Sequence, residues 1–366
     1  MRIIFDYQTF SIRQYSGISR YFVELAAALS RMDGVDVRVV GPLLASRFLA
    51  ERRGEVNVRG VDVSRMDGLP LRVVEVANRA LFRLVVRGLR PEIVHETLYA
   101  EGRTAPRCAK IVTTLHDTIP ERLPKFFPDV EGHRQRVRAA LERADAVICV
   151  SESTRRDVLE IYGVDEAKVR VVHLASSLEP VRDAVCGNAA PYFLHVGARY
   201  TYKNFGLLVE AFGRSGLWRT HRLRAFSSHG LTPEEWDAVE RAGIPRERIE
   251  ETGGDDRALA RAYAGAKALV LPSLYEGFGI PMVEAMRCGC PVIASNVSSL
   301  PEVGGDGARY CDPRDAESWA EAMRSVAEDS TLRKTMAMRG LERAAGFSWE
   351  RCAQETCAVY RELLAR

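Results

Sequence analysis

Two glutamates, Glu276 and Glu284, stand eight residues apart around a loop that ends at Gly279. The apolar run 268–271 before the loop predicts a buried strand, and Pro281 after it predicts the start of a helix. Glycine lets backbone amides approach a ligand, and a helix N-terminus attracts anions. The segment therefore predicts an anion site, with Glu276 at the ligand and Glu284 about two turns into the helix. A capped turn followed by an ordinary helix residue is the simpler interpretation.

Two cations stand in a second loop, directly after the apolar run 192–196. Arg199 and Lys203 follow an expected strand at its carboxyl end, which is where open parallel sheets bind ligands. Two cations at that place suit a diphosphate that is losing its bond to a sugar. A pair of solvated surface cations is the alternative.

Histidines follow two further expected strands. His116, with Asp117 beside it, comes after the run 111–115, and His95 comes after 93–94. A lone histidine is more often a packed core or surface group than a functional one. Both histidines nevertheless stand at strand ends, where open sheets bind ligands. His116 is therefore the first candidate for the acceptor side, and His95 is a secondary candidate for an acceptor site.

The elements that must position these residues alternate between short β-rich runs and amphipathic helical runs. This alternation predicts parallel sheets covered by helices on both faces. We expect a first series at 3–5, 19–30, 35–40, 71–89, 93–95, 111–115, 133–143 and 146–150, and a second at 192–196, 207–212, 223–226, 233–242, 249–251, 259–264, 268–271 and 292–294. The aperiodic, small-residue segment 181–190 between the two series is typical of a linker.

Composition narrows the class of protein. A chain of 366 residues suits two domains, and its net charge of +3 argues against nucleic acid as the main partner. No apolar run approaches the roughly 18 residues of a membrane span, and residues 1–6 do not resemble a signal peptide, so we expect a cytoplasmic protein. No dinucleotide fingerprint follows the first strand, which argues against an NAD enzyme. We interpret the eight cysteines as reduced packing residues, with a metal-binding Cys288/Cys290 pair as the minor alternative.

The segment from Glu276 to Glu284 resembles the Glu-x7-Glu signature of retaining glycosyltransferases, specifically family 4 with the GT-B fold. The runs 288–296 and 299–303 continue that family's pattern, and further matches cover nearly all of the chain. The resemblance implies an α/β protein of two doubly wound, Rossmann-like parallel-sheet domains that face a cleft. We therefore expect an acceptor-side domain at 1–180, a linker at 181–190, a donor domain at 191–348 and a terminal helix at 349–366 that crosses back to the first domain.

The resemblance also implies roles on the donor side. Lys203 and the following asparagine match the element that contacts the diphosphate, and Arg199 matches a variant found in mannosyltransferase-like members. Glu276 would contact the hydroxyls of the donor sugar, and Glu284 those of the ribose. The remaining implied donor contacts are main-chain groups of Phe278, Gly279 and Ile280, with Thr252, Gly253 and Leu259 at the base. No metal or other cofactor is expected, because the chain has no Asp-x-Asp and cations with a helix N-terminus can replace a divalent ion.

On the acceptor side, His116 resembles the family's histidine at the reaction centre, with Asp117 to orient it. Gly17 resembles the glycine loop that opens the first helix, although a plain helix start explains it equally well. The catalytic set expected is thus His116, Glu276, Arg199 and Lys203, with Gly17, Asp117 and His95 on the acceptor or phosphate side.

The function expected is retaining transfer of a hexose, mannose first, from a nucleotide-diphospho-sugar such as GDP-mannose to a glycan or lipid-linked acceptor in polysaccharide biosynthesis. A UDP-hexose donor is the first alternative. An epimerase or phosphorylase of the same fold, or a non-catalytic nucleotide- or glycan-binding protein, is the alternative of another class. Residues 71–90 form a basic amphipathic pattern that suits either peripheral contact with the inner face of a membrane or, more simply, core packing with a solvated arginine face.

Overall fold

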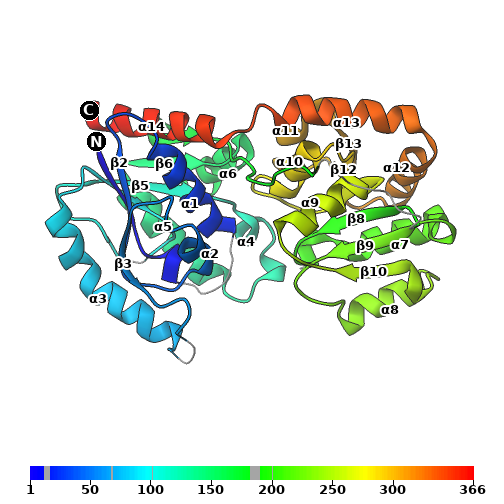
Figure 1. The fold of residues 1–366 in the computed structure, drawn as a ribbon, viewed down its shortest axis with the longest axis horizontal. Coiled ribbons are helices and arrows are strands. Elements are labelled where there is room, and N and C mark those ends of the chain that lie inside the picture. Colours follow the sequence, from blue (N-terminus) through cyan, green and yellow to red (C-terminus); the bar gives the residue numbers. More distant parts are fainter. Residues whose placement is uncertain (12–16, 67–68, 101, 182–189, 200) are drawn as a thin grey trace. The chain divides into compact units, whose positions relative to one another are not determined.

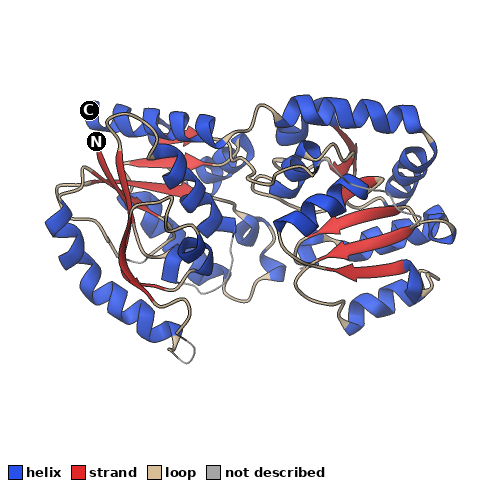
Figure 2. Ribbon diagram, in the orientation of Figure 1, coloured by secondary structure: helices blue, strands red, loops and turns tan. Residues whose placement is uncertain are grey.

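The computed structural model describes residues 1–11, 17–66, 69–100, 102–181, 190–199 and 201–366. These residues divide into two compact units, each a parallel sheet with flanking helices (Figures 1 and 2). Unit 1 contains Met1–Leu174 and Trp349–Arg366, and unit 2 contains Ala175–Ser348. The boundary falls at Leu174, whereas the sequence places it at 180, and most of the predicted linker, 182–189, lies outside the described residues.

Unit 1 is built on a seven-stranded parallel sheet with the strand order β3-β2-β1-β4-β5-β6-β7. The strands are β1 (Arg2–Phe5), β2 (Asp36–Leu44), β3 (Val58–Asp62), β4 (Ile93–Glu96), β5 (Lys110–Leu115), β6 (Ala146–Cys149) and β7 (Val169–Val171). Its helices are α1 (Gly17–Leu29), α2 (Arg47–Glu51), α3 (Leu71–Leu89), α4 (Ile119–Arg122), α5 (Val130–Arg143), α6 (Glu152–Tyr162) and α14 (Trp349–Ala365). The central strands are almost fully buried, because helices cover both of their faces.

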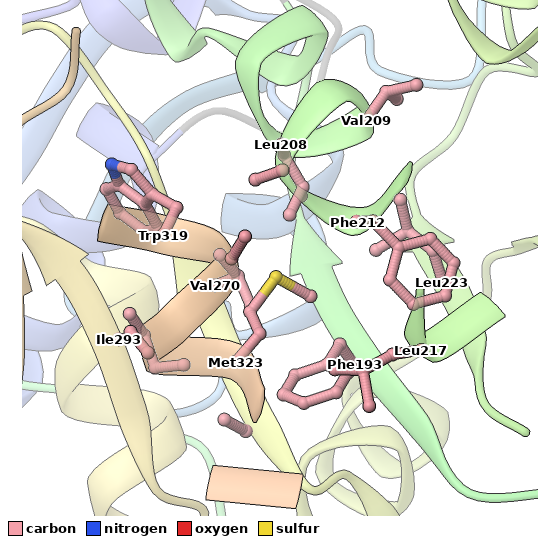
Figure 3. Close-up of a cluster of buried hydrophobic side chains, with 14 of the residues drawn as sticks. Phe193, Leu208, Val209, Phe212, Leu217, Leu223, Val270, Ile293, Trp319 and Met323 are labelled. Carbon is pink, nitrogen blue, oxygen red and sulfur yellow. The ribbon is translucent and has the colours of Figure 1, made fainter. Parts of the chain in front are cut away.

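Unit 2 is built on a six-stranded parallel sheet with the order β10-β9-β8-β11-β12-β13. The strands are β8 (Tyr192–Val196), β9 (Arg222–Phe226), β10 (Ile249–Thr252), β11 (Ala268–Leu271), β12 (Val292–Ser295) and β13 (Ala308–Cys311). Its helices are α7 (Phe205–Ser215), α8 (Pro233–Arg241), α9 (Asp256–Gly265), α10 (Ile280–Arg287), α11 (Leu300–Gly304), α12 (Ala316–Glu328) and α13 (Ser330–Ala344). Figure 3 shows the core between the sheet and its helices, in which Phe193, Phe212 and Trp319 are fully buried.

The terminal helix α14 belongs to unit 1, although unit 2 precedes it in the chain. Its Tyr360 is fully buried, and the phenol oxygen lies 2.6 Å from Nδ1 of His95 on β4. At the start of the helix, the ring of Trp349 lies 6.0 Å from that of Tyr21 on α1. The buried side chains of α14 therefore complete the core of unit 1.

Candidate active site

The residues predicted to bind the donor gather at one edge of the sheet in unit 2. All strand pairs in this sheet are parallel, so the carboxyl ends of β8, β10 and β11 lie at the same edge. The loop with Lys203 follows β8, the loop with Glu276 follows β11, and Thr252 ends β10. A ligand in an open parallel sheet binds at this edge.

Lys203 and Glu276 form an ion pair that is largely shielded from solvent. Nζ of Lys203 donates to Oε1 of Glu276 at 2.7 Å, and the two side chains are 18% and 8% exposed. The hydroxyl of Ser273 donates to the same carboxylate oxygen at 2.7 Å. An ammonium group has three donors, so pairing with one carboxylate oxygen does not by itself exclude contact with an anion. Sequence analysis did not single out Ser273, although it lies within the same motif.

Three hydrogen bonds hold the Lys203 loop, two of them against the Glu276 loop and one against the loop after β13. The side-chain amide of Asn204 donates to the carbonyls of Pro272 and Pro313, at 3.1 and 2.8 Å. The amide of Leu274 donates to the carbonyl of Tyr202 at 2.8 Å. Asn204 has a φ of 59°, a left-handed conformation that asparagine tolerates better than most residues. The asparagine of the motif thus positions its lysine neighbour.

The glycine of the motif is required by its backbone. Gly279 precedes α10 with a φ of 97°, and a Cβ there would lie 2.7 Å from Cδ2 of Leu300. Glycine alone adopts this conformation readily. Among the described residues no side chain caps the first turn of α10, in which Pro281 stands, so the amide end of the helix is suited to an anion.

Glu284 lies closer to the start of the helix than the sequence predicted. Because α10 begins at Ile280, Glu284 is about one turn into it rather than about two. It is 7% exposed, and the phenol of Tyr263 on α9 donates to its Oε2 at 3.0 Å. Burial and the neighbouring Glu284 raise the pKa of Tyr263 well above its usual value, so the phenol stays protonated and donates. No sequence pattern pointed to Tyr263.

Arg199 follows the carboxyl end of β8 as the sequence predicted, but its side chain is paired within the protein. Its Nε lies 3.0 Å from both carboxylate oxygens of Glu235, and its Nη2 donates to the carbonyl of His229 at 3.1 Å. The side chain is only 5% exposed. With its charge paired and its Nε and Nη2 donors engaged, Arg199 ties the loop after β8 to the start of α8. This arrangement favours a bracing role over direct contact with a diphosphate.

The predicted base-binding residues lie at and after the end of β10. Oγ1 of Thr252 is buried and has no hydrogen-bond partner among the described residues. A Cβ on Gly253 would lie 2.7 Å from the carbonyl oxygen of Ser227, so this loop closely approaches the one after β9. Leu259 is half-buried on α9. These positions share the ligand edge of the sheet, and their contact with a base stays a prediction.

In unit 1, His116 stands at the end of β5 as the sequence predicted. Its ring packs edge-on against Tyr21 at 5.1 Å, and its Nε2 is buried without a hydrogen-bond partner among the described residues. Burial lowers the pKa of His116 to about 4, so the imidazole is neutral near pH 7. The backbone amide of His116 donates to the phenol of Tyr99 at 3.4 Å. Oδ1 of Asp117 accepts from the amide of Ile119 at 3.0 Å and so shapes the following turn.

The other two acceptor-side candidates differ from each other. His95 is fully buried, with Nδ1 2.6 Å from the hydroxyl of Tyr360 and Nε2 2.8 Å from that of Thr114. Both ring nitrogens are occupied within the core, which argues against an acceptor role and favours a structural one. Gly17 is exposed and is the first residue of α1; the loop before it, 12–16, lies outside the described residues.

The described residues hold no cluster of side chains suited to a metal ion. No three histidine, cysteine, aspartate or glutamate side chains there could hold a metal ion together. Burial raises the pKa of Cys288 to about 12, so its thiol stays protonated near pH 7. No described helix is both long and apolar enough to cross a membrane.

Two family models match the chain, one in each unit. Residues 15–178 match the model described as Glycosyltransferase Family 4, and residues 190–329 match Glycosyl transferases group 1. The chain is 31% identical over 273 residues to O-antigen chain mannosyltransferase B of Escherichia coli, which covers 70% of this chain and 71% of the relative. It is 27% identical to the mannosyltransferase WbdA of Escherichia coli, covering 79% of this chain but only 39% of that relative.

Solved structures share the fold over the whole chain. A sucrose-phosphate synthase from Thermosynechococcus elongatus superimposes with a TM-score of 0.81 at 22% identity, covering 100% of this chain and 99% of that one. HepE from Anabaena, solved with UDP and glucose, gives 0.75 at 17% identity, covering 99% of this chain and 100% of that one.

The two parallel-sheet units and these matches define a glycosyltransferase of the GT-B fold. More particularly, the chain belongs to glycosyltransferase family 4.

Proposed function

We propose that the protein transfers a hexose, with mannose as the first candidate, from a nucleotide-diphospho-sugar to a glycan or lipid-linked acceptor. The observation that carries the proposal is the shielded Lys203–Glu276 pair beside the uncapped start of α10. A cation and a helix N-terminus suit the diphosphate, and two buried carboxylates suit sugar hydroxyls. Mannose comes first because two relatives are named as mannosyltransferases. UDP-hexose comes second, since HepE was solved with UDP-glucose.

We propose front-face substitution as the chemistry, so that anomeric configuration is retained. The bond from C1 of the sugar to the diphosphate oxygen breaks, and the acceptor oxygen bonds to C1 on the same face. The acceptor's proton passes to the leaving oxygen, and a nucleoside diphosphate departs. Lys203 and the amide end of α10 would stabilise the charge that grows on the leaving group. No step requires a metal ion.

On the acceptor side we propose that His116 hydrogen-bonds a sugar hydroxyl. Its neutral ring has one buried nitrogen that finds no partner among the described residues, and such a group is costly unless a ligand completes it. We propose that Arg199 holds the Lys203 loop in place through its ion pair with Glu235 and does not bind phosphate.

The first test is nucleotide binding. Thermal shift and calorimetry with GDP, UDP, ADP, dTDP and CDP, each with and without EDTA, should show one nucleotide that stabilises the protein regardless of EDTA. Lys203→Ala should abolish the stabilisation, whereas Lys334→Ala, an exposed lysine on α13, should retain it. No response to any nucleotide would favour the non-catalytic alternative.

We also propose that the protein is cytoplasmic and that α3 contacts the anionic inner face of the membrane. Val74, Phe82 and Val86 are buried, so one stripe of the helix packs on the core. Six apolar side chains are nevertheless exposed, namely Leu71, Val73, Val76, Leu81, Leu84 and Val85. Core packing with a solvated arginine face explains the arginines and leaves these apolar residues unexplained. Arginines beside exposed apolar residues suit the headgroup region of anionic lipid.

Vesicle co-sedimentation tests the membrane contact. Binding to vesicles with phosphatidylglycerol should exceed binding to pure phosphatidylcholine and should fall in the double variant Val73→Ser/Leu84→Ser. The matched control is Met338→Ser/Leu341→Ser, which removes two exposed apolar side chains from α13 of unit 2. Equal loss in both double variants would refute a specific role for α3.

A further inference from the structure

A pocket of about 740 Å³ opens within unit 1 between α3 and the loops that follow β1 and β4. Tyr7, Phe82 and Tyr99 line it with aromatic surface, and the first two rings pack at 4.9 Å. The phenol of Tyr99 accepts the backbone amide hydrogen of His116. The pocket therefore adjoins the residue that we propose for the acceptor, and it lies at the ligand edge of the sheet.

The lining of this pocket is strongly cationic. Its described lining contains four arginines, Arg79, Arg83, Arg103 and Arg136, and one acidic residue, Glu75. Arg103 donates to the carbonyls of Ala105, Pro106 and Ala109, and therefore mainly shapes the loop. The other three arginines, Arg79, Arg83 and Arg136, are the candidates for binding a ligand.

Those three arginines have donors to spare. Arg79 is exposed and makes no hydrogen bond or ion pair with the described residues. Arg83 donates through Nη2 to the carbonyl of Arg103 at 2.7 Å, and Arg136 pairs with the exposed Asp129 at 3.2 Å. A guanidinium has five N–H donors, so each of these single contacts leaves most of the fork available.

Two buried carboxylates lie near the pocket, and one of them is already paired with an arginine. Arg143 pairs with Glu96 at 2.7 Å, which neutralises it within the core. Burial, and then the neighbouring Glu96, raise the pKa of Asp6 to about 6, so Asp6 is still mostly charged near pH 7. Together with Glu75 it offsets part of the charge of the four arginines and leaves an excess of positive charge. Asp6 and Glu96 are both fully buried, and the hydroxyl of Thr104 bridges them on the pocket side.

We propose that this pocket binds a phosphate or diphosphate group carried by the acceptor, an inference that rests on the proposed glycosyl transfer. Arginine forks match the geometry of phosphate oxygens, and several together suit a multiply charged group. The aromatic walls suit the adjoining sugar ring. Leu71 lines the pocket and also begins the exposed apolar face of α3, so an apolar chain on the phosphate would have surface to follow.

Calorimetry on the full chain, saturated with the nucleotide that stabilises it, tests the inference without contributions from the donor site. The probes are inorganic diphosphate, farnesyl diphosphate and glucuronate. We expect diphosphate to bind more tightly than glucuronate, and Arg79→Gln to weaken it about tenfold or more. Arg87→Gln is the control, because Arg87 lies two turns along the same helix and outside the pocket. Both arginines are exposed, so both variants should melt like the wild type.

Each outcome decides a point. Tighter binding of farnesyl diphosphate than of inorganic diphosphate assigns the pocket to a lipid-linked acceptor, and equal binding assigns it to a soluble sugar phosphate. Nucleotide binding together with diphosphate affinity that Arg79→Gln leaves unchanged overturns the inference and spares the proposed function. Diphosphate binding that depends on Arg79 in a protein that binds no nucleotide supports the pocket and refutes the proposed function.

Discussion

Replacing Lys203 by methionine tests the reasoning about the donor site most directly. The change keeps the length of the side chain and removes the ammonium group that lies 2.7 Å from Glu276. Glu276 would remain 8% exposed, with its carboxylate accepting from Ser273. Breaking a fully buried ion pair costs about 3–5 kcal/mol, and the 18% exposure of Lys203 reduces the cost here to about 2 kcal/mol.

The same argument predicts a partial rescue. Glu276→Gln in the Lys203→Met background removes the unpaired charge, so the double variant should recover about 1 kcal/mol of the lost free energy of unfolding. Urea unfolding followed by tryptophan fluorescence measures this, because Trp218, Trp236 and Trp319 all lie in unit 2. Lys334→Met is the control for loss of a lysine from the surface of the same unit.

The double variant should regain stability but should not regain affinity for the nucleoside diphosphate. Both Lys203→Met and the double variant should weaken nucleoside diphosphate binding about tenfold to a hundredfold, because a charge-assisted hydrogen bond to phosphate is lost. If the double variant were less stable than Lys203→Met by the full cost of Glu276→Gln, the buried charge would not be the source of the penalty. If both variants bound nucleotide as tightly as wild type, Lys203 would not contact the diphosphate.

Three further predictions follow from single residues. Gly279→Ala should cost about 1–3 kcal/mol and weaken nucleotide binding, because its φ is 97° and its Cβ would meet Leu300, whereas Gly206→Ala, with nothing within 4 Å, should melt as wild type. Burial lowers the pKa of His116 to about 4 from 6.5, so the folded state holds fewer protons between these values. The free energy of unfolding of the wild type should therefore decrease as the pH is lowered from 6.5 to 4, and that of His116→Gln should decrease less. Urea unfolding measures both, and an equal decrease in the two proteins would contradict this prediction. Burial raises the pKa of Asp6 to about 6 from 3.8, so wild type loses stability as pH rises through this range, and Asp6→Asn should be less destabilising at pH 8 than at pH 5, which thermal melts at both values would measure.

Local sequence patterns predicted much of the architecture. Buried strands such as β8 and β11 stand out because helices cover both of their faces and their residues are nearly all apolar. The strands β3, β7 and β13, the short helices α2, α4 and α11, and the helices α12 and α13 were not predicted. β3 is largely exposed at the sheet edge and β7 has three residues, so neither has a clear apolar run.

The motif around Glu276 was the most informative part of the sequence, because its geometry is local. Gly279, Pro281 and the start of α10 are neighbours in the chain, and their backbone conformation follows from residue type. The predicted helix start at Pro281 lies within one residue of the observed start at Ile280. The distance to Glu284 was overestimated, because the four residues from Ile280 to Glu284 make only about one turn.

Pairings between distant residues could not be predicted. Arg199 is paired with Glu235, 36 residues away, and His95 with Tyr360, 265 residues away. A strand-end position predicted a ligand for each, and for Arg199 the family resemblance did so as well. In the structure each side chain is instead paired with another residue of the chain.

The sequence by itself determined the two series of strands and helices, the lysine and the two glutamates of the donor loop, and the histidine at the end of β5. Each follows from local spacing and conformational preference. The tertiary structure decided which charges are paired within the protein and which are left for a ligand. It paired Arg199, joined Lys203 to Glu276 and placed Arg79 beside an aromatic pocket. The physical reason is that burial and pairing depend on residues that are far apart in the chain and that only the folded sheets bring together.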